Sequence, residues 1–96
     1  MGSFAYDRDD LHVSDALKQK TIQYCQESSI ERFGSFKVEK FEDTDGFKYI
    51  IDEDSWTMIR PSGTEPVLRV YGQAKNDEEV RKLLDAVGDT IRSLDQ

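Results

Sequence analysis

The residues that could do chemistry are concentrated in one short loop. Residues 60–66 read RPSGTEP, and a second arginine, Arg69, follows closely. Ser62 and Thr64 supply hydroxyl donors, and Gly63 lets backbone N–H groups approach a ligand because it has no side chain. A turn of this kind can direct several N–H groups at one anion, and a guanidinium grips phosphate through paired hydrogen bonds. We therefore identify Arg60, Ser62, Gly63, Thr64 and Arg69 as a candidate oxyanion site.

The same loop also suits an ordinary surface turn. Gly, Ser and Pro are turn formers, and Arg60 and Arg69 could each pair with an acidic neighbour. A nucleophilic role for Ser62 is disfavoured, because no adjacent base is apparent in the sequence. The acidic run at residues 52–54 lacks the spacing of a calcium loop and indicates a solvated turn. The pattern alone leaves anion binding and a plain turn both open, and it names no ligand.

Composition narrows the class of protein. The chain has 96 residues, which predicts one domain, and its 13 basic and 20 acidic residues give a net charge of −7. This acidity disfavours nucleic acid and anionic membrane as partners, because both need a basic face. No apolar run approaches the ~20 residues of a membrane helix. The single cysteine, Cys25, has no partner for an internal disulfide and predicts a cytoplasmic protein.

The elements that must position the loop follow from periodicity. Residues 1–13 are expected to be an irregular linker, and residues 14–96 one folded domain. Ser14 and Asn76 are the expected N-caps of two helices with apolar stripes, the first ending near Ile30. Alternating apolar residues predict four antiparallel strands between the helices, and the turn before Gly46 joins the first two. The expected strands are 36–41, 47–52, 56–60 and 67–73, with both helices on one face of an α+β fold.

The loop and the strand after it carry a family resemblance. RPSGTEP followed by VLRVY at residues 67–71 resembles the phosphate-binding loop of the alpha-D-phosphohexomutase superfamily. Tyr71 and the hairpin that precedes the loop are similar to the bacterial phosphoglucomutase/phosphomannomutase branch. The resemblance covers about residues 14–96 and implies the C-terminal, fourth domain of these enzymes, with a fold like that of the TATA-binding protein.

The resemblance implies a function that the residues alone do not name. In this family the loop binds the non-reacting phosphate of a hexose phosphate, which assigns that contact to Arg60, Ser62, Gly63, Thr64 and Arg69. The enzymes interconvert hexose 1- and 6-phosphates through a magnesium-bound phosphoserine and a hexose 1,6-bisphosphate. The family's phosphoserine and metal motifs do not occur in this chain. We therefore expect a fragment that works with other domains of the same polypeptide and is inactive alone.

Two alternatives from other classes remain open at this point. The chain could be a free-standing binding module for phosphorylated small molecules. It could also bind nucleic acid, as the TATA-binding-protein-like fold suggests, although the acidic charge opposes this.

Overall fold

Two helices and seven strands make up the described part of the chain, residues 4–27, 30–44 and 46–94 of a computed structural model. In chain order the elements are β1 (Ala5–His12), α1 (Asp15–Gln26), β2 (Arg32–Phe33), β3 (Phe36–Lys37), β4 (Lys40–Glu42), β5 (Phe47–Ile50), β6 (Trp56–Pro61), β7 (Val67–Ala74) and α2 (Asp77–Ser93).

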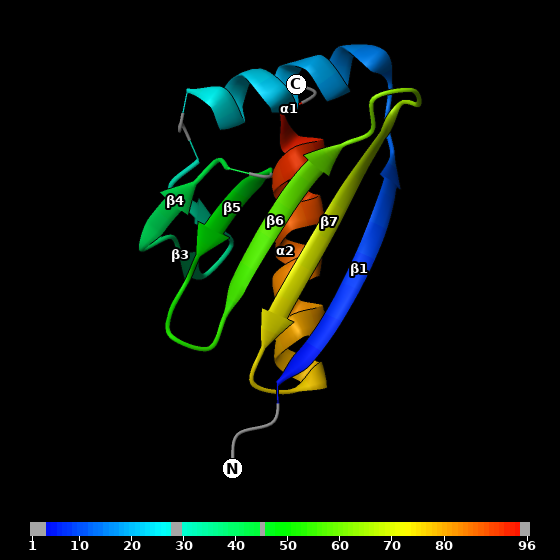
Figure 1. Ribbon diagram of the computed structural model, residues 1–96. Coiled ribbons are helices and arrows are strands. Elements are labelled where there is room, and N and C mark those ends of the chain that lie inside the picture. The colour runs from blue at the N-terminus through cyan, green and yellow to red at the C-terminus, as the bar shows by residue number, and fades with distance from the viewer. Residues whose placement is uncertain (1–3, 28–29, 45, 95–96) are drawn as a thin grey trace.

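The main sheet has five described strands in the order β1-β7-β6-β5-β4, and every neighbouring pair is antiparallel. Figure 1 shows β6, β7 and β1 as long strands side by side, with the shorter β5 and β4 toward the other edge. The loop at residues 62–66 joins β6 to β7, which are both interior strands. The two ends of the candidate loop are therefore held by strands that are paired on both sides.

The segment expected to be an irregular linker is largely a strand, and this prediction was wrong. β1 pairs with β7 from Ala5 opposite Ala74 to His12 opposite Val67. Its inward positions include Asp7 and Asp9, which hide the usual alternation of apolar and polar residues. The fifth strand therefore comes from a stretch in which two acidic residues, Asp7 and Asp9, lie on the helix side of the sheet and remain partly exposed.

One face of the sheet packs against α2, the long helix behind the sheet in Figure 1. Inward side chains from β6 and β7, such as Ile59 and Val70, are buried beneath the apolar stripe of this helix. A Cβ placed on Gly72 would lie 2.9 Å from a methyl of Leu84, so helix and sheet approach closely there. The predicted cap is confirmed, because the Asn76 side chain accepts a hydrogen bond from the Glu79 amide.

The shorter helix α1 lies across one end of the sheet (Figure 1). Its predicted cap is also confirmed, since the Ser14 hydroxyl accepts a hydrogen bond from the Leu17 amide. Leu17 and Cys25 belong to the same buried cluster as the residues under α2, so both helices contribute to one core. The helix ends at Gln26, earlier than predicted.

The α+β class with an antiparallel sheet is confirmed, and the predicted second, third and fourth strands correspond to β5, β6 and β7. The predicted strand at residues 36–41 is divided in two. β3 pairs with β2 in a separate two-stranded ribbon, and β4 pairs with β5. Neither described helix is long and apolar enough to cross a bilayer.

Candidate functional site

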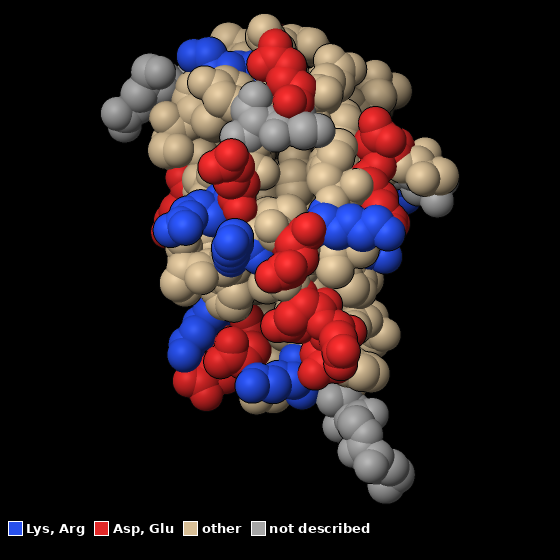
Figure 2. Space-filling model, turned by 90° about the vertical axis from the view of Figure 1, so that its left-hand side faces the viewer, with Lys and Arg blue, Asp and Glu red and all other residues tan. Residues whose placement is uncertain are grey.

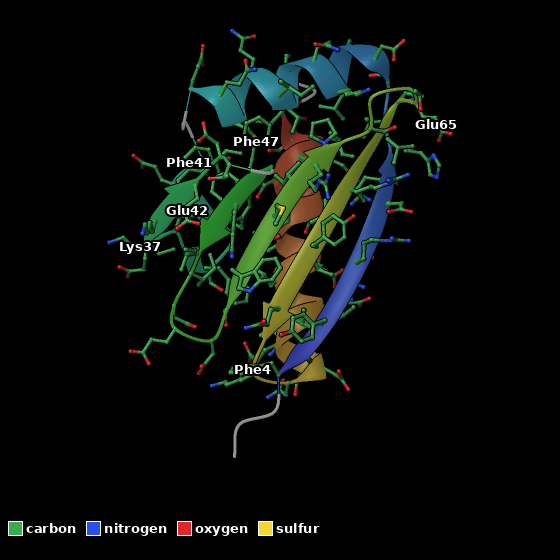
Figure 3. The ribbon with its side chains drawn as sticks, in the orientation of Figure 1. Phe4, Lys37, Phe41, Glu42, Phe47 and Glu65 are labelled. Carbon is green, nitrogen blue, oxygen red and sulfur yellow. The ribbon has the colours of Figure 1, made fainter. Side chains whose placement is uncertain are left out.

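The loop is a tight connection whose backbone is closed by its own hydrogen bonds. The Ser62 amide donates to the Val67 carbonyl at 2.9 Å, and the Val67 amide donates to the Glu65 carbonyl at 2.8 Å. In Figure 3 the labelled Glu65 marks this connection at the end of the sheet, close to the start of α1. The loop therefore presents its side chains and the Gly63 amide from a fixed hairpin end.

Arg60 and Arg69 occupy directly opposed positions in the ladder between β6 and β7. Their neighbours Ile59, Leu68 and Val70 are buried against the helices, so the two arginines lie on the open face of the sheet. Both arginines are exposed. Like charges placed directly opposite each other destabilise an antiparallel pair. An anion bound between the guanidinium groups would remove that repulsion.

The plain-turn reading required acidic partners for these arginines. Within the described residues, neither Arg60 nor Arg69 forms a salt bridge with a carboxylate. Asp10 stands opposite Arg69 in the neighbouring ladder, but its carboxylate pairs with Arg8 at 3.4 Å. No carboxylate of the described residues therefore pairs directly with either guanidinium group.

Ser62 organises the loop interior. Its hydroxyl oxygen accepts hydrogen bonds from the amides of Thr64 at 3.3 Å and Glu65 at 3.2 Å. Two consecutive N–H groups thus converge on one oxygen atom, which is the donor geometry that an anion oxygen also needs. Both bonds are long, and Ser62 is only partly buried. The loop therefore holds a small set of convergent donors around a hydroxyl.

Gly63 and Thr64 form the open tip of the loop. A Cβ placed on Gly63 would meet no atom within 4 Å. Among the described residues, neither the Gly63 amide nor the Thr64 hydroxyl has a hydrogen-bond partner. These two groups are free to donate to a ligand. All five predicted site residues lie either on this loop or on the two strands that flank it.

One residue beside the site escaped the sequence analysis. The Lys18 ammonium group donates to the carbonyl oxygens of Ser62 at 2.5 Å and Glu65 at 2.9 Å. Lys18 lies 44 residues before Ser62, and only the packing of α1 against the end of the sheet brings them together. The only sequence signal for this contact was that Lys18 lies one turn inside the predicted helix. Many surface lysines have such a position, so the signal is not specific.

The remaining candidates have local structural roles. The Asp52 carboxylate accepts a hydrogen bond from the Asp54 amide at 2.8 Å, as expected for a solvated turn. Within residues 4–27, 30–44 and 46–94, no three His, Cys, Asp or Glu side chains are grouped as a metal site. Trp56 lies under the Lys48 ammonium group, 4.7 Å from the ring centre. Figure 2 shows acidic and basic side chains interspersed on the side that it displays.

Comparison with known proteins places this loop in a family. The family model described as "Phosphoglucomutase/phosphomannomutase, C-terminal domain" matches residues 10–90, which include every residue of the candidate site. The chain belongs to this family.

Individual relatives agree with this assignment. A phosphoglucosamine mutase from Methanocaldococcus jannaschii is 35% identical over 78 residues, covering 81% of this chain and 16% of the relative. A phosphoglucomutase/phosphomannomutase from Thermococcus kodakarensis is 46% identical over 46 residues, covering 48% of this chain and 10% of the relative. A phosphopentomutase from the same organism is 30% identical over 77 residues, covering 80% and 17%. The chain thus spans only a small part of the length of these relatives.

A solved structure shows the same fold. A phosphoglucomutase/phosphomannomutase family protein from Burkholderia thailandensis superposes with a TM-score of 0.62 over 99% of this chain and 18% of its own, at 17% identity. Because the match covers 99% of this chain, it extends over β1 as well as over the strands that the sequence predicted.

Proposed function

We propose that this chain is the substrate-phosphate-binding domain of a hexose phosphomutase. The observation that carries the proposal is the directly opposed pair Arg60 and Arg69, which has no carboxylate partner among the described residues. A phosphate monoester carries about two negative charges near neutral pH and offers three acceptor oxygens. It complements two guanidinium groups and a loop with unused donors.

The roles divide by chemistry. Arg60 and Arg69 supply charge-assisted hydrogen bonds, the strongest contacts that the site offers. The Gly63 amide and the Thr64 hydroxyl supply neutral donors, and Ser62 keeps the turn in shape while its own proton remains available. Because neither hydroxyl of the loop donates a hydrogen bond to a base among the described residues, the proposed contribution of the site is positioning and charge stabilisation.

A mutase of this kind must hold a sugar phosphate in two orientations, with phosphate at either end. The tip of the loop is exposed, and a Cβ placed on Gly63 would meet no atom within 4 Å. Such a site recognises the phosphate group and tolerates a reversed sugar. The same property lets it hold one phosphate of a hexose 1,6-bisphosphate.

The rest of the reaction belongs outside this chain. No group of carboxylates among the described residues fits magnesium, and the family's phosphoserine motif is absent from the sequence. We propose that other domains of one polypeptide supply these parts, and that the 96-residue chain has no turnover alone. We place the protein in the cytoplasm, because a phosphorylated sugar substrate and a single buried thiol are typical of a cytoplasmic enzyme.

Ligand-observed NMR with the isolated chain tests the proposal. Glucose 1-phosphate and glucose 6-phosphate should bind with similar millimolar dissociation constants, about −4 kcal/mol, and unphosphorylated glucose should not bind. Equal binding of glucose itself would show that the loop recognises sugar and would contradict the proposal. A preference of more than about tenfold for one phosphate isomer would contradict recognition through the phosphate alone.

A further inference from the structure

The ammonium group of Lys18 is the only described cation that reaches the loop from outside its two strands. It bonds to two loop carbonyls, those of Ser62 and Glu65, and its side chain is partly buried between α1 and the loop. We propose that Lys18 is a positioning residue that orients the Gly63 amide for phosphate binding. This inference rests on the proposed function of the loop.

Peptide geometry connects the lysine to the amide. The carbonyl of Ser62 and the N–H of Gly63 belong to one peptide group, and the described chain contains no cis peptide bond. In a planar trans peptide the C=O and N–H bonds point in opposite directions. Because the Ser62 carbonyl points at Lys18 on the α1 side, the Gly63 N–H must point away from α1, where no described atom takes it up.

The first turn of α1, which carries Lys18, is itself joined to the loop by the backbone. The Lys18 amide donates to the Ser14 carbonyl at 2.9 Å within the first turn of α1. Just before that turn, the Val13 amide donates to the Pro66 carbonyl at 3.0 Å, at the far end of the loop. The start of α1 and the loop are thus joined at three carbonyls, those of Ser62, Glu65 and Pro66.

Electrostatics favours the same role. A carbonyl oxygen that faces a bound phosphate repels it, whereas an N–H group attracts it. Lys18 draws two carbonyl oxygens of the loop to the side away from Gly63 and places a full positive charge there. An ammonium group has three donors, so two carbonyls and one remaining proton satisfy it. No neutral side chain of similar length can replace both the bonds and the charge.

Residual dipolar couplings and phosphate titration, measured on the intact 96-residue chain, test this role together. In Lys18→Met the Gly63 N–H coupling should change, because the peptide is free to rotate. The dissociation constant for inorganic phosphate should rise about tenfold. Lys18→Arg keeps the charge and several donors and should restore most of the affinity. Lys20→Met, on the exposed side of the same helix, should change neither quantity.

The outcomes separate this inference from the proposed function. If Lys18→Met binds phosphate as well as the parent chain with an unchanged Gly63 coupling, the positioning role is overturned. If affinity falls while the coupling stays the same, Lys18 acts as a direct ligand or a distant charge, which also overturns it. If the parent chain binds no phosphate but the Gly63 coupling responds to Lys18→Met, the proposed function fails, and Lys18 is shown to orient the Gly63 amide but not for phosphate binding. Couplings across β6 and β7 report whether each variant is folded.

Discussion

Gly46 makes room for the side chain of Arg60. A Cβ placed on Gly46 would lie 2.7 Å from Cγ of Arg60 and 3.1 Å from Sδ of Met58. Gly46 ends the turn before β5, and its neighbour Phe47 pairs with Ile59 in the ladder next to Arg60. The first carbons of the arginine therefore lie against bare backbone, which sets the direction in which the guanidinium leaves the sheet.

This contact predicts the effect of Gly46→Ala. The added methyl should displace Arg60 and weaken phosphate binding about threefold to tenfold, because a charge-assisted bond depends on geometry. The atoms nearest to the added methyl belong to the flexible side chains of Arg60 and Met58, which can shift, so the thermal midpoint should fall only slightly. Isothermal titration with phosphate and a thermal melt measure the two effects. Gly46→Ala with unchanged affinity would show that Arg60 needs no such guidance.

The opposed arginines predict that removing either one lowers the affinity for phosphate without lowering the stability of the fold. Arg60→Ala and Arg69→Ala should each weaken phosphate binding by about 1.5–3 kcal/mol. In phosphate-free, low-salt buffer each should leave the stability unchanged or raise it by a few tenths of a kcal/mol, because the cross-strand repulsion is removed. Urea unfolding and titration of the same samples check both signs. Arg92→Ala, at an exposed site on α2, is the matched control. A clear loss of stability in either loop variant would assign the arginines to the fold.

Arg81 should hold β1 in the sheet. Its guanidinium bonds to the carboxylates of Asp7 and Asp9 on β1 and to Asp85 on its own helix. The hydrogen bond with Asp9, followed by nearby carboxylate charge, raises the pKa of Arg81. Because these side chains are partly exposed, we expect Arg81→Ala to cost only about 1–2 kcal/mol. Hydrogen exchange should then accelerate along β1 more than along β5, and uniform acceleration would contradict a local clasp.

The core predicts how stability depends on pH. Burial raises the pKa of the Cys25 thiol from an ordinary 9.0 to about 11, and the nearby Tyr49 hydroxyl, which has no hydrogen-bond partner among the described residues, offsets this rise only in part. Burial also raises the pKa of Tyr49. Above pH 9 the unfolded chain loses the thiol proton while the folded chain keeps it, so stability should fall as the pH rises toward 11. The Cys25 contribution is about 2–3 kcal/mol.

Urea unfolding between about pH 8 and pH 11 measures this slope. Cys25→Ala should be less stable near pH 8, because a buried side chain is shortened, but its stability should fall less steeply between pH 9 and pH 11. Equal slopes in the two proteins would contradict an ionisation of Cys25 coupled to unfolding.

The elements that the sequence predicted well are those with local signals. The caps at Ser14 and Asn76 and the strands around the loop follow from side-chain preferences and alternation, and the structure confirms them. β1 was missed because Asp7 and Asp9 occupy inward positions, and the compensating Arg81 lies 72 to 74 residues away. Lys18 was missed for the same reason. Contacts between residues far apart in the chain produce no periodic pattern in the sequence. The residues of the loop, in contrast, are almost consecutive, so their chemistry can be recognised from the sequence.

Chemical-shift mapping with inorganic phosphate tests the central claim most directly. The ¹H–¹⁵N spectrum of the chain is followed at constant ionic strength, with chloride exchanged for phosphate. We predict that the Ser62, Gly63 and Thr64 amides and the Nε signals of Arg60 and Arg69 move together, with one dissociation constant in the millimolar range. Shifts confined to another surface, or no shifts at saturating phosphate, would contradict a phosphate site on this loop.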